Sequence, residues 1–411
     1  NPISEAYSNH RYDTGDYKKI DPLLGTEEDF AILVEECAKR GIKIMLDGVF
    51  NHTGDDSRYF NKYGRYDELG AYQSKDSKYY AWYTFSQYPN KYDSWWGIDC
   101  LPAVNENCNS YVEFITGEEG VLRHWLKYDL AGFRLDVADE LPDEFIEKIR
   151  SAVKTKNPEA LVLGEVWEDA SNKIAYSKRR KYFQGKELDC VMNYPLKNAI
   201  IHYVTSRDTT VLRNTIAMLR DNYPKTVLDS LMNILGTHDT VRILTAFGGI
   251  PARTKDEMNV LKMDAATRDR AKEHLKIASV ILFTLPGVPC IYYGDEIGME
   301  GYSDPFCRMP FAWKSIDEEI LSHYRRLSVI RTKLSVFKEA EYRELFHDEN
   351  CLVYERRIEG EVAVVAINLG YNKFDLCFSG KMYELLSGNE FSGRYTLSTM
   401  SCAILSNKTA F

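Results

Sequence analysis

The stretch Gly132-Phe133-Arg134-Leu135-Asp136 decides the fold of this chain. It reads as a short apolar strand with charged residues at its end. Because side chains alternate along a strand with a period of two, Arg134 and Asp136 lie on the same face. Four polar strand ends of this kind predict a parallel sheet with its functional side chains at the carboxyl edge. The other three stretches are Asp47-Gly48-Val49-Phe50-Asn51-His52, Gly164-Glu165-Val166-Trp167 and Gly236-Thr237-His238-Asp239.

Strand and helix signals alternate around these stretches. Thr26 and the acidic residues after it are typical of a helix start, and Gly41 is typical of a helix end. Repeated strand–helix units with functional residues at strand ends favour a (β/α)8 barrel over an open doubly wound sheet, and no Gly-x-Gly-x-x-Gly or P-loop motif competes. We expect helices over 26–39, 113–128, 142–153, 272–285 and 317–333, and strands over 42–46, 132–135, 161–163, 188–192, 231–235 and 289–293.

The predicted domains are a barrel, a long insertion and a terminal sheet. The barrel takes residues 1–52 and 110–337. With a partial strand ahead of Asn1 we count seven strands, so we expect the first strand and its helix to be missing. Residues 53–109, rich in Tyr, Asp, Asn, Gly and Ser, are expected to form a loop domain inserted after the third barrel strand. Over 338–411 the alternation stops, and short apolar runs predict a C-terminal antiparallel β domain.

Composition restricts the classes of partner. The net charge of −9 over 411 residues argues against a nucleic-acid-binding protein, because such proteins need a basic face. The longest apolar run, 278–293, contains Pro286 and Pro289, so we expect no membrane-spanning helix and no membrane partner. The 9 cysteines lack metal-site spacing and indicate a reducing, cytoplasmic location, with secretion left open. Cys100 and Cys108 could form a disulfide.

Asp136 and Glu165 suit the cleavage of a glycosidic bond with retention of configuration. That chemistry needs two carboxyl groups about 5–5.5 Å apart, an ionised nucleophile and a protonated acid. Arg134 beside Asp136 favours the ionised carboxylate, so Asp136 is the predicted nucleophile. Glu165 has a longer reach and lies between Gly164 and the apolar Val166-Trp167, which favours the protonated acid.

Other polar strand ends have supporting roles in this hypothesis. Asp239 is a third carboxylate that could stabilise the positive charge of an oxocarbenium-like transition state. His52 and His238 can donate hydrogen bonds to sugar hydroxyls, and Asp47 is expected to support Arg134 or a loop amide. Each residue alone has an ordinary alternative as a cap, a surface group or a salt bridge. All four stretches in order are difficult to explain as caps.

These stretches resemble the four signature regions of the α-amylase family, glycoside hydrolase family 13, and residues 101–105 resemble its fifth. The resemblance covers nearly the whole chain. It implies that Asp136 is the nucleophile, Glu165 the acid/base and Asp239 the transition-state stabiliser. The sugar-binding subsite that it implies at the cleaved bond consists of Tyr12, Asp47, His52, Arg134 and His238.

Residues 8–17, 236–242 and 292–299 resemble one subgroup of that family, the neopullulanases, cyclomaltodextrinases and maltogenic amylases. That subgroup often has Val-Ala-Asn-Glu after the nucleophile, whereas this chain has Val137-Ala138-Asp139-Glu140. Asp139 and Glu140 are therefore candidate substrate contacts on the leaving-group side. An acidic start to the helix at Pro142 is an equal alternative.

Four further side chains are weaker candidates. Trp95 and Trp96 could face the substrate cleft, and packing inside the loop domain explains them equally well. Asp295 and Arg308, which follow the last predicted strand, are expected to form salt bridges.

The resemblance implies a retaining hydrolase of α-1,4 glucosidic bonds, with α-1,6 bonds as a further option, acting by double displacement on starch-derived oligosaccharides, cyclodextrins or pullulan. A 4-α-glucanotransferase with the same covalent intermediate is the alternative. A non-catalytic glucan-binding homologue fits less well, because the chain keeps all three carboxylates.

The same resemblance implies which cofactors and partners to expect. The chemistry needs no cofactor and no metal ligand is predicted, although a structural calcium held by Asn51 and loop-domain aspartates stays open. The implied partners are an α-glucan oligosaccharide or polysaccharide and a second copy of the chain, joined through a region upstream of Asn1.

Overall fold

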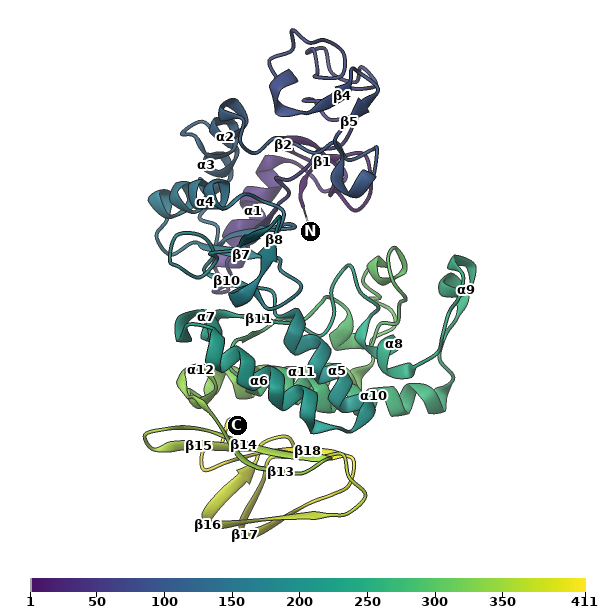
Figure 1. Cartoon of the computed structure of the whole chain (residues 1–411). Coiled ribbons are helices and arrows are strands. Elements are labelled where there is room, and N and C mark those ends of the chain that lie inside the picture. The colour runs from purple at the N-terminus through teal and green to yellow at the C-terminus, as the bar shows by residue number, and fades with distance from the viewer. Residues whose placement is uncertain (1) are drawn as a thin grey trace. The chain divides into compact units, whose positions relative to one another are not determined.

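The computed structural model describes residues 2–411, which divide into two compact units (Figure 1). Unit 1 is Asn1–Met192 and unit 2 is Asn193–Phe411. The partial strand predicted ahead of Asn1 lies outside the described residues. The domain boundaries predicted at residues 52, 109 and 337 stay a prediction.

Unit 1 is built on a four-stranded parallel sheet in the order β10-β7-β6-β3. Its strands are β3 (Met45–Gly48), β6 (Gly132–Leu135), β7 (Leu161–Gly164) and β10 (Cys190–Val191). All residues of β6 are buried, as expected for a central parallel strand. The strand predicted from residue 42 begins at Met45 instead, because Ile42 is exposed and Gly41 closes the preceding helix with a φ of 72°.

The helices of unit 1 begin where the sequence signals place them. Helix α1 (Glu27–Ala38) starts with a capping box between Thr26 and Asp29, and α4 (Asp143–Lys156) starts directly after Pro142 and packs on β7 (Figure 1). The single helix predicted over 113–128 is wrong. It is two helices, α2 (Asn109–Thr116) and α3 (Val121–Leu126), because extended backbone at Gly117 and Gly120 interrupts the hydrogen bonding.

Two regions of unit 1 contain strands that the sequence did not indicate. Strands β1 (Ser4–Ala6) and β2 (Thr14–Ile20) form an antiparallel pair near the start of the chain. The segment 53–109 contains the hairpin β4 (Phe85–Gln87) and β5 (Lys91–Tyr92) with two 3-10 turns, η1 (Tyr80–Trp82) and η2 (Trp95–Gly97). Its buried aromatic side chains include Tyr59, Phe60 and Trp82, and the rings of Tyr59 and Trp82 also contact Phe114 outside the segment.

Two short antiparallel strands precede β10 in unit 1. They are β8 (Ile174–Ala175) and β9 (Lys178–Arg179), and the 3-10 turn η3 (Ala170–Asn172) comes before them. Lys173, between η3 and β8, contacts one of the candidate site residues, as described below.

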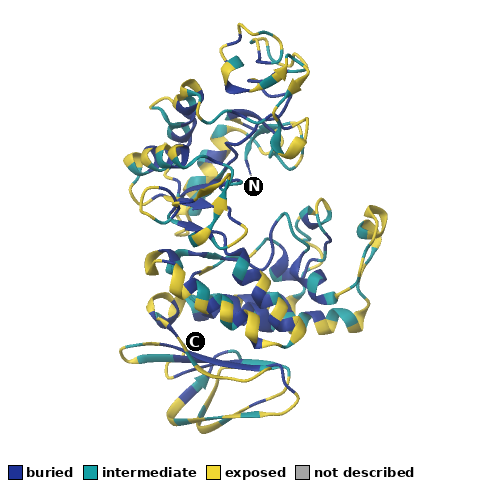
Figure 2. Cartoon of the chain, in the orientation of Figure 1, coloured by how far each residue is buried: buried dark blue, intermediate teal, exposed yellow. Residues whose placement is uncertain are grey.

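Unit 2 begins with helices arranged around a short parallel strand pair, β11 (Met232–Asn233) and β12 (Val288–Pro289). Its longest helix, α10 (Ala265–Thr284), is buried from Ile277 to Thr284 (Figure 2). This buried half explains the apolar run of the sequence. The other helices are α5 (Tyr194–Ser206), α6 (Thr209–Asn222), α7 (Lys225–Ser230), α8 (Ile243–Gly248), α9 (Lys255–Val260), η4 (Asp295–Ile297), η5 (Phe306–Arg308), α11 (Glu318–Lys333) and α12 (Val336–Glu339).

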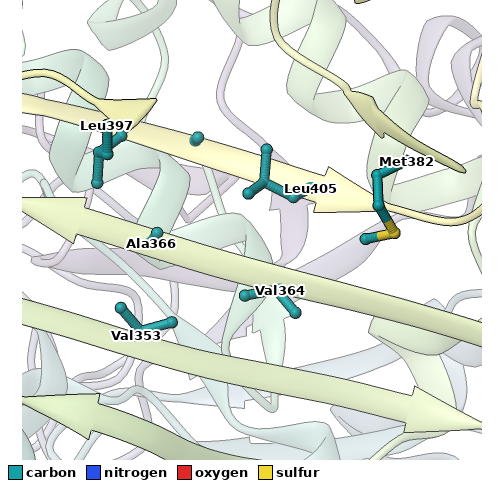
Figure 3. Close-up of a cluster of buried hydrophobic side chains, with 7 residues drawn as sticks. Val353, Val364, Ala366, Met382, Leu397 and Leu405 are labelled. Atoms are coloured by element: carbon teal, nitrogen blue, oxygen red, sulfur yellow. The ribbon is translucent and has the colours of Figure 1, made fainter. Parts of the chain in front are cut away.

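The end of the chain forms the predicted antiparallel sheet, with six strands in the order β13-β14-β15-β18-β16-β17. Alternating apolar residues of these strands point to one face and pack into a cluster around Val353, Val364, Met382 and Leu405 (Figure 3). The strands are β13 (Tyr342–His347), β14 (Cys351–Ile358), β15 (Glu361–Asn368), β16 (Phe374–Glu384), β17 (Asn389–Leu397) and β18 (Ser401–Ser406).

Two sequence expectations concern cysteines and membranes. All nine cysteines are free thiols, so the Cys100–Cys108 bridge is not formed. Within residues 2–411, no helix combines the length and apolar character that crossing a bilayer requires.

Candidate functional site

One buried arginine organises the polar strand ends of unit 1. Arg134 Nη1 lies 2.7 Å from Asp47 Oδ1 and 2.6 Å from Asp136 Oδ1, and Nη2 lies 2.8 Å from Glu165 Oε2. None of these four side chains is more than 9% exposed. We call Asp47, Arg134, Asp136 and Glu165 the carboxylate cluster.

The register of the parallel sheet brings the cluster together. Asp47 on β3 is directly paired with Arg134 on β6. The hydrogen-bond ladder then continues one residue past the strands, because Asp136 N donates to Gly48 O and Glu165 N donates to Leu135 O. Asp47 therefore lies level with Arg134, while Asp136 and Glu165 lie level with each other just past the ends of β6 and β7.

Glu165 is held by two further donors. The backbone N–H of Val137 donates to Oε2 at 2.9 Å, and the indole Nε1 of Trp167 donates to Oε1 at 3.1 Å. Val137 is a β-branched residue at a φ of 40°, a strained conformation that points its N–H at the carboxyl group. Neither donor was anticipated, although Trp167 lies two residues after Glu165, at the spacing of side chains on one strand face.

The electrostatics of the cluster differ from the sequence expectation. Burial raises the pKa of Asp136, and the charges of Glu165 and Asp47 raise it further, while Arg134 acts in the opposite direction. Arg134 thus lowers the pKa of Asp136, as expected, but burial and the two neighbouring carboxyl groups outweigh its effect. One guanidinium is shared by three carboxyl groups, so its charge offsets only part of the cost of burying the Asp136 carboxylate.

Asp47 is the member of the cluster that stays charged. Burial opposes its ionisation, but Arg134 and the hydroxyl of Tyr12 hold the pKa of Asp47 below its usual value. Tyr12 donates to Asp47 Oδ2 at 2.8 Å, and its ring centre lies 5.9 Å from the Arg134 guanidinium. Asp47 thus supports Arg134 through the same nitrogen that contacts Asp136, as its sequence context suggested.

His52 is a neutral side chain beside this cluster. Burial lowers the pKa of His52 to about 4, and its Nε2 lies 3.1 Å from the carbonyl oxygen of Tyr12. A carbonyl oxygen can only accept, so Nε2 carries the proton and donates it. The Trp95 ring stacks on the imidazole at 5.3 Å between centroids.

Asp139 and Glu140 lie in the turn between Asp136 and α4. Lys173 contacts Asp139 Oδ2 at 3.0 Å, and Trp96 Nε1 donates to Glu140 Oε1 at 2.5 Å. The acidic first turn of α4 is formed by Asp143 and Glu144 instead. Asp139 and Glu140 therefore do not form the acidic start of this helix, which was the alternative role considered for them.

Unit 2 carries the fourth polar stretch. His238 Nε2 lies 3.1 Å from Asp239 Oδ2, and Arg308 Nη2 lies 3.0 Å from Asp239 Oδ1. Arg308 Nε also donates to the carbonyl oxygen of His238 at 2.8 Å, which ties the end of η5 to this stretch. The salt bridge predicted for Arg308 is confirmed.

A second buried arginine in unit 2 was quoted in the sequence motif but given no role. The Arg242 guanidinium lies 4.7 Å from the ring centre of Tyr292 and 4.9 Å from that of Tyr293, and its Nη1 lies 3.3 Å from Asp295 Oδ1. Burial raises the pKa of Asp295 to about 7, against the effect of Arg242. The salt bridge predicted for Asp295 is confirmed. A Cβ on Gly236 would lie 2.5 Å from Asp295 Oδ2, so this pair explains the glycine of the motif.

Within the described part of the chain, no three His, Cys, Asp or Glu side chains are grouped so that they could hold a metal ion. The amide of Asn51 donates to Glu106 Oε1 at 3.2 Å, so it is engaged in a contact inside unit 1.

The sequence-predicted residues thus fall into two sets. Unit 1 brings together Tyr12, Asp47, His52, Arg134, Asp136 and Glu165, with Asp139 and Glu140 in the adjoining turn. Unit 2 brings together His238 and Asp239.

Comparison with known proteins assigns the chain to a family. Residues 1–344 match the family model described as alpha amylase, catalytic domain. An amylopullulanase of Thermoanaerobacterium saccharolyticum is 36% identical over 410 residues, covering 90% of this chain and 31% of that protein. A cyclomaltodextrinase of Geobacillus thermopakistaniensis is 32% identical over 409 residues, covering 95% of this chain and 63% of that protein.

Among solved structures, the ligand-free cyclic alpha-maltosyl-(1→6)-maltose hydrolase of Arthrobacter globiformis matches with a TM-score of 0.81 and 27% identity, covering 99% of this chain and 85% of the other. The chain spans about a third of the length of the amylopullulanase and under two thirds of that of the cyclomaltodextrinase. These matches confirm the expected fold class, a (β/α)8 barrel with a C-terminal antiparallel sheet, and the resemblance to the cyclomaltodextrinase subgroup. The chain belongs to the α-amylase catalytic-domain family.

Proposed function

We propose that this chain carries the active site of a retaining α-glucan hydrolase. It cleaves α-1,4 bonds, and α-1,6 bonds as a second linkage, in starch-derived oligosaccharides, cyclodextrins or pullulan. The observation that carries the proposal is the carboxylate cluster, in which Asp136 and Glu165 both contact Arg134. The names of the relatives, which include an amylopullulanase and a cyclomaltodextrinase, support this class of substrate.

The first chemical step uses Asp136 and Glu165 in different protonation states. Asp136 attacks the anomeric carbon, the bond from that carbon to the leaving oxygen breaks, and Glu165 gives its proton to the leaving oxygen. In the second step Glu165 takes a proton from water, the water oxygen attacks the anomeric carbon, and the bond to Asp136 breaks. A cluster with one arginine and three carboxyl groups readily supplies the single proton that this cycle needs.

The contacts around the cluster support these roles. The Val137 N–H and the Trp167 indole hold both oxygens of Glu165, which fixes the direction of proton transfer. Arg134 holds Asp136 through Oδ1 at 2.6 Å, which leaves Oδ2 as the attacking oxygen. Tyr12 and the neutral His52 lie beside the cluster and are proposed to contact the sugar ring at the cleaved bond.

Asp239 is proposed to stabilise the oxocarbenium-like transition state, with His238 as a donor to a sugar hydroxyl. The support for this role is the family resemblance of the stretch and the firm placement of the carboxylate by Arg308 and His238. Asp139 and Glu140 are proposed as contacts on the leaving-group side.

The remaining expectations stay proposals. The domains are proposed at 1–52 with 110–337, at 53–109 and at 338–411. The chemistry uses side chains alone. Structural calcium is not proposed, because the described residues offer no fitting donor set. A homodimer and a cytoplasmic location stay predictions, which sedimentation of the full-length protein and cell fractionation would test.

The decisive test replaces the two reacting carboxyl groups in the full-length protein. Asp136→Asn and Glu165→Gln should each lower kcat on maltoheptaose and β-cyclodextrin by at least about 10³-fold, because each removes one chemical role at nearly constant volume. The matched control is Asp375→Asn, which removes an exposed carboxylate of the C-terminal sheet and should leave the rate unchanged. Near-normal turnover by either of the first two variants would overturn the proposal.

A further inference from the structure

A buried arginine of unit 1 holds the turn between the predicted nucleophile and helix α4. Arg180 directly follows β9 and is 7% exposed. Its Nη2 donates to the carbonyl oxygen of Leu141 and lies 3.5 Å from that of Ala138. The hydroxyl of Tyr182, whose ring centre lies 5.1 Å from the guanidinium, donates to the same Ala138 oxygen at 3.4 Å. Two side chains of one loop therefore hold the carbonyl groups of residues 138 and 141.

The N–H groups of the same turn donate to the predicted acid. Val137 N donates to Glu165 Oε2 at 2.9 Å, and Ala138 N donates to the main-chain oxygen of Glu165 at 3.2 Å. A Cβ on Gly164 would lie 3.3 Å from Ala138 Cβ, so the turn packs closely against the end of β7. The turn therefore joins Arg180 to Glu165 through two sets of hydrogen bonds.

Backbone strain in this turn makes the contacts of Arg180 important. Val137 is β-branched and lies at a φ of 40°. Such a conformation persists only where the surrounding structure holds it. Arg180 and Tyr182 hold the residues that follow Val137. Without these contacts we expect the turn to relax and the Val137 N–H to move away from Glu165.

Support of helix α4 is the simplest alternative role for Arg180. Its Nε lies 3.0 Å from Asp143 Oδ1, in the first turn of that helix. However, a cation beside a helix N-terminus opposes the helix dipole, and a buried ion pair is weak evidence for a gain in stability. Stabilisation of α4 therefore explains Asp143 better than it explains Arg180.

The charge of Arg180 also acts on a second buried acid. Glu187 is 0% exposed, and among the described residues neither of its carboxyl oxygens has a hydrogen-bond partner. Burial raises the pKa of Glu187 to about 7, and the charges of Asp143 and Glu147 raise it further, while Arg180 and Lys181 act in the opposite direction. A neutral side chain in place of Arg180 would remove this charge from both acids. The variant that tests the turn must therefore keep the positive charge.

We propose that Arg180 is a positioning residue for proton transfer by Glu165. The proposal rests on the function proposed above. Arg180 acts through the turn, because it fixes the carbonyl groups of residues 138 and 141 and so keeps the Val137 N–H on Glu165 Oε2. A carboxyl group that keeps its orientation meets the leaving oxygen in the geometry that proton transfer requires. Tyr182 assists through its hydrogen bond to Ala138.

Two substrates that differ in their need for a proton test this role in the full-length protein. Maltoheptaose releases a sugar hydroxyl that must be protonated, whereas fluoride leaves α-maltosyl fluoride with little help from an acid. Arg180→Lys should lower the ratio of kcat/KM for maltoheptaose to that for α-maltosyl fluoride by about tenfold, because one ammonium cannot bind Asp143 and two carbonyl groups together. This loss is smaller than the roughly 10²–10⁴-fold contribution of a general acid, since Trp167 still holds the other oxygen of Glu165.

A matched control and a milder variant complete the design. Arg150 Nη1 lies 2.7 Å from Asp189 Oδ1 and 3.3 Å from the carbonyl oxygen of Glu187, so it too contacts a carboxylate and a main-chain carbonyl. Arg150→Lys should leave the ratio unchanged. Tyr182→Phe removes one hydroxyl and should lower the ratio by about two- to threefold. If Arg180→Lys does not fold, the ratio of Tyr182→Phe decides.

The effect of Arg180→Lys should disappear in a protein that lacks the acid. Adding it to Glu165→Gln should change the ratio by less than about twofold, because the group that Arg180 positions no longer delivers a proton. A further tenfold loss in the double variant would overturn the proposal, since Arg180 would then act elsewhere in the site.

Two results with the single variants would also overturn it. In one, Arg180→Lys lowers both kcat/KM values equally. In the other, the protein loses thermal stability while the ratio stays that of the unmodified protein, which would mean that Arg180 only supports α4. Failure of the proposed function looks different, because the unmodified protein would then turn over neither substrate.

Discussion

Two buried arginines, one in each unit, have opposite surroundings. Arg134 in unit 1 faces three carboxyl groups within 2.8 Å, whereas Arg242 in unit 2 faces one carboxyl group and two tyrosine rings. Both guanidinium groups are almost removed from water, with exposures of 9% and 0%. A buried arginine therefore has a different set of partners in each of the two sites.

The two arginines differ in the number of carboxyl groups that contact them, three at Arg134 and one at Arg242. Burial raises the pKa of Asp136, and the charges of Glu165 and Asp47 around Arg134 raise it further. Arg242 contacts a single acid and two adjoining tyrosine rings, and it holds the segment around Asp295 against α8. Buried charge alone therefore does not mark a reactive site.

The largest effect is expected from removing the structural arginine. Arg242→Ala should lower the free energy of unfolding by about 3–5 kcal/mol, because it leaves the buried Asp295 unpaired. Thermal and urea unfolding followed by tryptophan fluorescence would measure it. The double variant Arg242→Ala with Asp295→Asn should recover part of the loss. No recovery would mean that the tyrosine contacts, not the ion pair, carry the stability.

Substitution of Arg134 is expected to have a smaller effect, and to lower the catalytic rate instead of the stability. Arg134→Lys should lower kcat on the order of 10²–10³-fold, since a single ammonium cannot contact Asp47, Asp136 and Glu165 together. Initial rates on maltoheptaose would show it. Arg242→Lys is the matched control and should lower kcat far less. Equal losses in the two variants would remove the distinction between the sites.

The smallest effect is a shift in pH dependence. Catalysis by the cluster should give a bell-shaped profile of kcat/KM against pH, whose acid limb reports the loss of the Asp136 carboxylate. The charge of Asp47 raises the pKa of Asp136, so Asp47→Asn should lower that pKa and move the acid limb to lower pH. The exposed Asp375→Asn serves as control. If the acid limb stays in place or moves to higher pH, the charge of Asp47 does not raise the pKa of Asp136.

Much of the fold followed from local patterns. Strand β6 matches the predicted range 132–135, and the capping box at Thr26 marks the start of α1, because alternation and capping are local properties of the chain. The helix expected over 113–128 failed at Gly117 and Gly120, where two glycines interrupt an otherwise helical pattern. Strands β1 and β2 were missed because their pairing joins segments of mixed polarity.

The candidate site was predictable only in part. The strand ends identified Asp47, Asp136 and Glu165 as polar groups beyond apolar runs, and the parallel register then placed them around Arg134. The donors to Glu165 depend on the strained backbone at Val137 and on the side-chain direction of Trp167, which no spacing reveals. The sequence left Trp96 open between packing and binding, and only the structure shows that its side chain is exposed.

The sequence by itself determined which residue types stand at the ends of the strands, since the period of two and the apolar runs before them are written in the chain. Only the tertiary structure decided their charge states. The pKa of Asp136 depends on how deeply it is buried and on how many carboxyl groups share Arg134 with it, and both come from distances between strands far apart in sequence. Local sequence placed an arginine beside an aspartate, and the fold added two more acids to that pair.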